Sequence, residues 1–144
     1  MADAAAVNEM VEFELVAPER LVLSLSAEMV VVPCAEGDIG VLPGHAPLIG
    51  TVRPGVVDIH EKGKVSERIF VTGGFVEVTP DRCTLLAEEA TPVAELTREI
   101  ADKRMADAQS AIEKAESDSE KHAAVAAVAA AEAMAAALGT PQQH

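Results

Sequence analysis

The sequence predicts a two-part β + α fold: an N-terminal antiparallel β-sandwich, or flattened barrel, followed by a C-terminal α-helical hairpin. Three observations predict it. Before residue 91, apolar and polar residues alternate in short runs. Glycine and proline separate these runs about every eight to twelve residues, which is typical of a sandwich or barrel. After residue 91 alanine dominates, and alanine has the highest intrinsic helix propensity.

The change in composition at Thr91-Pro92 is the one clear internal boundary. We therefore expect a flexible N-terminus over 1–10, a sandwich over 11–90, a helical hairpin over 91–139 and a flexible tail over 140–144. The chain has 144 residues and 49% hydrophobic composition, enough for a packed core, and with three Phe and no Trp or Tyr this core must be aliphatic.

The strands are predicted from period-two alternation. Residues 11–17 (VEFELVA) and 21–26 (LVLSLS) each place apolar side chains on one face. Residues 55–74 are typical of a hairpin that turns at Lys62-Gly63, and residues 75–89 repeat the pattern and finish at an acidic strand end.

The two helices are predicted from capping signals. Thr91 is a plausible N-cap with Pro92 at the first helical position. Ser117 and Glu120 form a capping-box pattern for the second helix, which should end at Gly139. Lys103 and Arg104 are interpreted as part of a solvated helix face.

The expected apolar stripes are Leu96, Ile100, Ala108 and Ile112 in the first helix, and Val125, Val128, Ala131, Ala135 and Leu138 in the second. Because these stripes are rich in small residues, we expect a thin contact and a weakly docked, movable hairpin.

Charge excludes several classes of partner. The formal net charge is −13, and the three aromatic residues supply little surface for base stacking, so nucleic acid is not expected as a partner. An anionic lipid surface is disfavoured for the same electrostatic reason.

No membrane span is expected, because the nearest apolar run, Ala123–Leu138, is mostly alanine and is interrupted by Glu132. Cys34 and Cys83 are expected to be reduced, buried thiols of a cytosolic protein.

Catalytic and metal-binding patterns are missing from the sequence. The paired glycines of "VTGGF" lack the GK[ST] of a phosphate-binding loop and are interpreted as a tight turn. No histidine stands at metal-ligand spacing from another histidine or a cysteine. Asp58 and His60 share one strand face and are interpreted as a solvated polar face. No nucleophile and base can be combined from these residues, so the chain is not expected to be an enzyme and no cofactor is expected.

The stretch 39–55, IGVLPGHAPLIGTVRPG, contains a turn that proline fixes at both ends, Pro43-Gly44-His45-Ala46-Pro47. From residue chemistry alone, His45 either fixes this turn or contacts a partner.

Taken in order, "FELVAPER", "AEGDIGVLPGHAPLIGTVRPGVVDI" and "RIFVTGGFVEVTPDRCTLLAE" resemble the epsilon subunit of the F-type, proton-translocating ATP synthase, bacterial type. The resemblance covers residues 11–90 by motif and 92–138 by architecture. It implies a sandwich of two five-stranded sheets, about ten strands in all. It also implies a non-catalytic rotor subunit of the central stalk, which clamps the gamma subunit, rests on the c-subunit ring and couples the ring to the catalytic head. Such a subunit is peripheral, on the cytoplasmic face of the bacterial inner membrane.

The resemblance also implies site residues. Glu36, Asp38 and His45 match the loop end that faces the c-ring. In the family the hairpin can extend toward the alpha and beta subunits and inhibit hydrolysis, and some members bind ATP through an [IL]-D-x-x-R pattern. The equivalent here is Ala94–Arg98, in which Glu95 replaces the aspartate and Arg98 is kept. Glu95 and Arg98 also match an ordinary exposed helical pair.

Two expectations about the hairpin and one alternative follow. Because the motif departs from the family pattern, ATP binding is not expected. Because no Lys or Arg follows Lys121, we expect weak inhibition or none. The alternative is a protein-binding β-sandwich module unrelated to any rotor, with a helical dimerisation tail.

Overall fold

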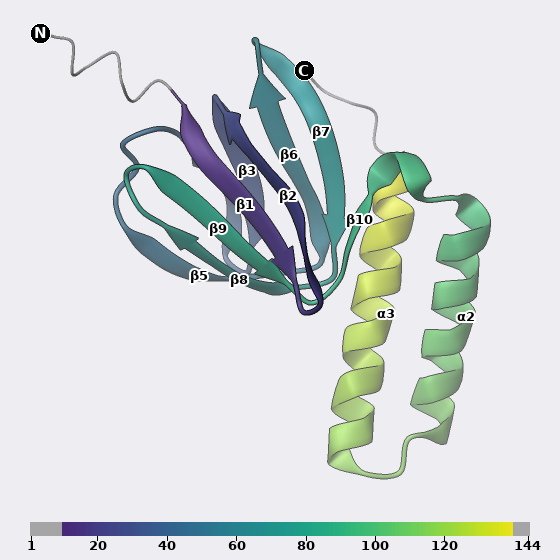
Figure 1. Ribbon diagram of the computed structural model, residues 1–144. Coiled ribbons are helices and arrows are strands. Elements are labelled where there is room, and N and C mark those ends of the chain that lie inside the picture. The colour runs from purple at the N-terminus through teal and green to yellow at the C-terminus, as the bar shows by residue number, and fades with distance from the viewer. Residues whose placement is uncertain (1–9, 140–144) are drawn as a thin grey trace, which may run out of the picture.

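The computed structural model describes residues 10–139, which form a β-sandwich with a helical hairpin beside it (Figure 1). The strands are β1 (Val11–Ala17), β2 (Arg20–Ala27), β3 (Met29–Cys34), β4 (Gly37–Val41), β5 (Leu48–Val52), β6 (Gly55–Glu61), β7 (Lys64–Val71), β8 (Gly74–Val78), β9 (Arg82–Ala87) and β10 (Ala90–Pro92). The helical elements are the short 3₁₀ helix η1 (Val93–Glu95), α2 (Arg98–Lys114) and α3 (Asp118–Gly139). Of the flexible ends predicted at 1–10 and 140–144, all residues except Met10 lie outside the described residues.

The strands form two layers of five. One has the order β10-β7-β6-β3-β4 and the other β5-β8-β9-β1-β2, and the layers are joined where Cys34 of β3 pairs with Val52 of β5. All neighbouring strands are antiparallel except β1 and β9, which are parallel. The predicted sandwich of about ten strands followed by a helical hairpin is confirmed.

The core lies between the two layers and is aliphatic, as the sequence predicts. In β1 the side chains of Val11, Phe13 and Leu15 are fully buried while Glu12 is exposed, so the period-two pattern does separate core from surface. Both cysteines are free and buried in this core, again as predicted.

Two backbone positions of the sandwich depend on glycine. Lys62 and Gly63, between β6 and β7, both have positive φ (55° and 79°), which is typical of the type I′ turn that matches hairpin twist. Gly74 has φ 143°, and a Cβ atom there would lie 2.0 Å from the backbone oxygen of Leu86. The paired glycines of residues 73–74 therefore permit a close approach of β8 to β9.

The predicted start of the first helix is wrong. Thr91 and Pro92 belong to β10, where Thr91 pairs with Phe70 of β7. The N-cap of α2 is Thr97, whose hydroxyl accepts a hydrogen bond from the amide of Ile100 at 3.2 Å. Pairing with β7 outweighs the local capping signal, so the N-cap is Thr97 rather than Thr91.

The capping box at the start of α3 is confirmed. The Ser117 hydroxyl accepts from the Glu120 amide at 3.0 Å, and Glu120 Oε1 accepts from the amides of Glu116 and Ser117. These backbone donors stabilise the carboxylate and lower the pKa of Glu120. The helix extends to Gly139, which is the last residue that the structure describes.

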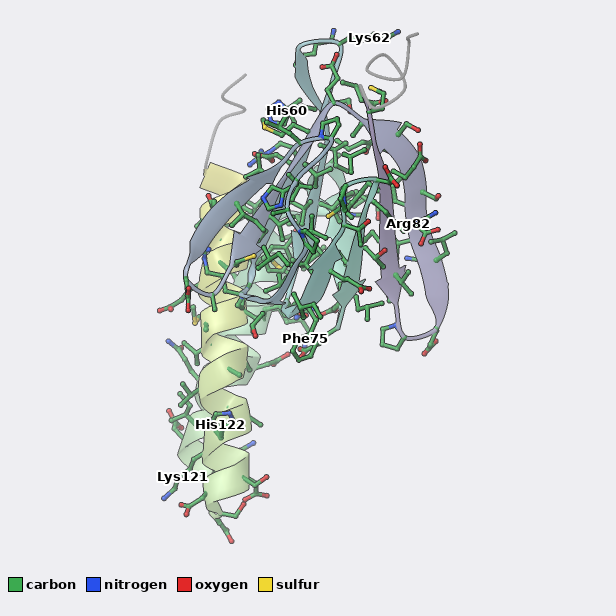
Figure 2. All side chains as sticks on the ribbon, turned by 90° about the vertical axis from the view of Figure 1, so that its left-hand side faces the viewer. His60, Lys62, Phe75, Arg82, Lys121 and His122 are labelled. Atoms are coloured by element: carbon green, nitrogen blue, oxygen red, sulfur yellow. The ribbon has the colours of Figure 1, made fainter. Side chains whose placement is uncertain are left out.

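The apolar contact of the hairpin with the sandwich lies near the start of α2 and the end of α3. Phe70 of β7 is buried against Leu96, Ala101, Met134 and Ala137. The opposite end of the hairpin, with Lys121 and His122, extends past the sandwich (Figure 2).

The helix–helix contact is built from small residues, and part of the predicted stripes is wrong. Ile100, Ile112 and Val125 are 42%, 45% and 61% exposed. Leu96, Ala108 and Ala131 of the predicted stripes are buried. Ala101, Ala124 and Ala130, which the stripes did not include, are buried as well. Small side chains let the two helix backbones approach closely, so the larger residues turn outward.

One finding bears on the membrane prediction. By length and composition alone, α3 is apolar enough to span a membrane, with a mean hydropathy of 1.5. A single helix of this kind is weak evidence, because soluble helices pass the same test. The packing of Met134 and Ala137 on the sandwich gives the apolar residues near its end a partner within the chain.

Candidate functional surfaces of the sandwich

An apolar row crosses the outer side of the layer β5-β8-β9-β1-β2. Its members come from four neighbouring strands and are adjacent by register: Phe75 pairs with Leu86, Leu86 with Val16, and Val16 with Leu21. Phe75, Leu86 and Leu21 are 59%, 53% and 55% exposed. Ile49 of β5, 75% exposed, lies on the same side. We call these five residues the outer apolar face.

The outer apolar face was not predicted, although the sequence contains a signal for it. Strict alternation puts one apolar residue at every second position. Leu15-Val16, Phe75-Val76 and Leu85-Leu86 are apolar at two successive positions. Since successive side chains of a strand point to opposite faces, one member of each pair has to face outward. A row of such residues is typical of a protein–protein interface.

The acidic turn between β3 and β4 is held by Arg53, which lies in the connection between β5 and β6. Asp38 Oδ1 accepts a hydrogen bond from Arg53 Nη2 at 2.6 Å, and Arg53 Nη1 donates to the carbonyl oxygen of Cys34 at 2.5 Å. Glu36, at the tip of the turn, is exposed and forms no ion pair with the other described residues. Asp38 is therefore neutralised within the chain, and Glu36 carries the uncompensated charge of this turn.

His45 lies in the connection between β4 and β5. Its Nδ1 is 2.7 Å from the carbonyl oxygen of Ala46, so the imidazole donates a hydrogen bond within the loop. The amide of Gly44 donates to Pro80, which ties this loop to the β8–β9 turn. Of the two roles considered for His45, fixing the turn or contacting a partner, these bonds favour fixing the turn.

The structure does not bring the three predicted ring-facing residues together. Glu36 precedes β4 and His45 follows it, and the four residue steps of this strand span about 13 Å. Glu36 and Asp38 form one site at one end of β4, and His45 belongs to another at the other end.

Glu95 and Arg98 are not a helical pair. Glu95 is in η1, Arg98 is the first residue of α2, and the extended residues Leu96 and Thr97 separate them. Both side chains are exposed. Their spacing in the sequence therefore does not become the i, i+3 contact expected of one helix.

The strand pair Asp58 and His60 is also less solvated than expected. Asp58 Oδ1 lies 3.2 Å from Arg68 Nε on β7 and is half-buried. His60 is 9% exposed. A bulge between Ile59 and His60 changes the side to which His60 points, which alternation alone does not reveal.

An ion pair between α2 and the β9–β10 connection links the hairpin to the sandwich. Arg104 Nη2 of α2 bonds Glu89 Oε2, in the short connection between β9 and β10. Lys103, its neighbour in α2, pairs within the helix with Asp107 at 3.0 Å. Only Lys103 therefore fits the predicted solvated helix face.

Burial leaves both thiols poor nucleophiles. Desolvation raises the pKa of Cys83 to about 12, and it also raises the pKa of Cys34, where the nearby Arg53 opposes the rise. Among residues 10–139 there is no group of three or more His, Cys, Asp or Glu side chains placed to hold a metal ion.

The comparisons with known proteins agree with one another. The family described as "ATP synthase, Delta/Epsilon chain, beta-sandwich domain" matches residues 10–93. The chain is 55% identical to the ATP synthase epsilon chain of Paramagnetospirillum magneticum over 130 residues, covering 90% of this chain and 98% of the relative. It is 54% identical to that of Rhodospirillum rubrum, covering 90% and 96%.

Solved structures show the same fold. A chain of the Euglena gracilis mitochondrial ATP synthase (OSCP/F1/c-ring) superposes with a TM-score of 0.76 at 22% identity, covering 90% of this chain and 82% of that one. A chain of the Tetrahymena thermophila mitochondrial ATP synthase central stalk and c-ring gives 0.69 at 16% identity, covering 89% and 96%.

The family match across the sandwich, together with more than half of the residues shared with epsilon chains over nearly their full length, excludes the unrelated binding module considered as an alternative. The two-layer sandwich with a helical hairpin, its anchored acidic turn and its outer apolar face thus belong to a member of the ATP synthase epsilon chain family, a non-catalytic subunit of that complex.

Proposed function

We propose that this chain couples the c-ring to the gamma subunit in the central stalk of a bacterial ATP synthase, and that it docks gamma with the outer apolar face. Family membership supports the rotor role. The observation that carries the assignment of the surface is the row of exposed apolar residues at Phe75, Leu86 and Leu21. A rotor subunit has to stay bound while it transmits torque, and a broad exposed apolar row on a sheet is typical of a stable protein–protein interface.

The c-ring contact is assigned to Glu36 and Asp38. Their turn is held rigid by Arg53, which bonds both Asp38 and the backbone of Cys34. An acidic group on a fixed turn suits a polar or basic loop, and such rim charges favour the correct register more than they add affinity. We assign His45 to the architecture of the neighbouring loop.

The chain is peripheral in this proposal and reaches the cytoplasmic side of the bacterial inner membrane through protein contacts. The hairpin is assigned at most a weak inhibitory role toward the alpha and beta subunits. No Lys or Arg follows Lys121, so the second half of α3 has no basic side chain with which to contact an acidic segment of the catalytic head. The one charged residue in that half, Glu132, is acidic.

The experiment that tests this proposal is affinity purification of the tagged chain from gently solubilised membranes, with its partners identified by mass spectrometry. The wild-type chain should recover gamma and c subunits together with alpha and beta. Leu86→Glu should lose gamma by about tenfold or more, because it places a charge in the centre of an apolar interface.

Ile112→Glu is the matched control, since it makes the same kind of change at an exposed site on α2. Equal circular dichroism spectra would show that both variants fold. Recovery of the wild-type chain alone would contradict the rotor role. Unchanged recovery with Leu86→Glu would contradict the docking face.

A further inference from the structure

The two layers of the sandwich are open between β4 and β5. Among residues 10–139, β4 pairs only with β3, and β5 meets β3 only at Cys34–Val52. Between the two strands lies a groove of about 570 Å³. It is lined by residues 34–39 of β3–β4, residues 48–51 of β5, and Phe75 of β8.

The backbone of β5 presents unpaired groups to this groove. Thr51 O accepts from the amide of Ala35 at 2.8 Å, and the amide of Arg53 donates to Pro33 O at 2.9 Å. In an antiparallel strand, alternate residues direct their backbone groups to the same side. The N–H and C=O of Ile49 therefore also face this side, beyond the last bond to β3, and no described strand pairs with β5 there.

The side chains around the groove select the kind of occupant. Its walls carry Ile39, Ile49 and Phe75, and Asp38 is neutralised by Arg53. Ile49 and Phe75 belong to the outer apolar face as well, so the groove continues the surface that is assigned to gamma. The charge at the mouth is that of Glu36, which would repel an acidic side chain.

We propose that the groove receives one extended, mostly apolar segment of the gamma subunit, which pairs with the free edge of β5 at Ile49. The inference rests on the proposed function and adds the mode of binding to it. A strand is favoured over a helix because only an extended backbone supplies partners for the N–H and C=O of Ile49. A second copy of this chain is disfavoured because two chains of net charge −13 repel each other.

The test compares Ile49→Pro with Ile49→Ala in titrations against purified gamma subunit. Proline removes the N–H that faces the groove, whereas alanine keeps it and loses more of the apolar side chain. The pairing of β5 with β8 uses the backbone groups of Leu48 and Gly50, which face the other way, so Ile49→Pro should fold. We expect Ile49→Pro to bind gamma at least about fivefold more weakly than Ile49→Ala, the value of roughly one hydrogen bond.

Amide hydrogen exchange of the unmodified chain gives a second measurement that needs no variant. The Ile49 amide should exchange at least about tenfold more slowly with gamma bound, while the Lys62 amide, at the tip of the β6–β7 turn, should not change. Equal binding by the two variants, or an unprotected Ile49 amide, would overturn the inserted strand. If Leu86→Glu still abolishes binding in that case, the docking face stands without it. If the wild-type chain does not bind gamma, the proposed function and this inference fall together.

Discussion

At the scale of the residue, Gly74 determines how closely β8 approaches β9. Its φ of 143° is rarely adopted by other residues, and any Cβ would collide with backbone atoms of Leu86 and Ala87. Backbone atoms cannot move aside as a flexible side chain can. The side chain of Leu86, part of the outer apolar face, therefore depends on the absence of a side chain at residue 74.

We predict that Gly74→Ala lowers the free energy of unfolding by about 2 kcal/mol or more, from backbone strain together with the collision. Urea denaturation of the purified chain measures it. Gly50→Ala is the control, because its Cβ would meet Cys34 Sγ and Val76 Cγ1 at an ordinary 3.7 Å. Similar unfolding midpoints for the two variants would show that the β8–β9 contact is looser than described.

The two thiols should differ in reactivity. The thiolate is the nucleophile, and burial raises both pKa values, that of Cys83 to about 12. Cys34 is 8% exposed against 0% for Cys83 and has Arg53 nearby. We predict that iodoacetamide at pH 8 modifies the native chain slowly, at Cys34 before Cys83, and that both react rapidly in urea. Peptide mapping by mass spectrometry gives the order, and faster reaction of native Cys83 would contradict it.

At the scale of the element, the hairpin is held by a small apolar cluster around Phe70 and by the Arg104–Glu89 ion pair. Most of each helix, including the end with Lys121 and His122, extends away from the sandwich (Figures 1 and 2). Short apolar contacts and a partly exposed ion pair stabilise a docked position only modestly, which supports the expectation of a movable hairpin.

We predict that Arg104→Glu increases opening of the hairpin and that adding Glu89→Arg partly restores docking. Both side chains are partly exposed, so the coupling between the two sites should be only about 0.2–1 kcal/mol and should shrink at high salt. Hydrogen exchange of the amides near Met134 measures opening. Lys103→Glu, which leaves the interface untouched, is the control. A coupling of zero at low salt would remove this ion pair from the account of docking.

Local sequence patterns predict some of the strands and helix ends but not others. Period-two alternation located β1 and the β6–β7 hairpin because local pattern and burial coincide there. The predicted start of the first helix is wrong because Thr91 pairs with Phe70, a residue far from it in the chain. This strand pairing outweighs the local capping signal. His60 was placed on the solvent face because a bulge is invisible to alternation.

The candidate sites divide in the same way. The Gly/Pro stretch 39–55 indicated turns correctly, but the sequence could not show that β4 separates Glu36 from His45. Nor could it identify Arg53 as the partner of Asp38. The outer apolar face requires the register of five strands, which no local pattern contains. Long-range pairing is thus the information that local sequence analysis lacks.

At the scale of the whole molecule, the buried core of the sandwich, with residues from Val11 to Ala87, contains no residue of the helical hairpin. We predict that deleting residues 97–144 leaves a folded sandwich, since β10 and its pairing with β7 remain. ATP hydrolysis by the assembled complex should rise by less than the roughly fivefold that marks the low end of allosteric coupling. The measurement is hydrolysis by membranes that contain the full or the shortened chain. Strong activation would show that the hairpin inhibits without basic residues.

The parallel pairing of β1 with β9 has a consequence for how the chain acquires its shape during synthesis. β1 leaves the ribosome first, yet one of its two neighbours is made only when residues 82–87 appear. Until then β1 and β2 form an isolated hairpin, which is marginal in water. The layer that contains β1 is therefore completed only after β9 has been made. The helical hairpin of α2 and α3 follows in the chain and reaches a sandwich whose strands have all been made.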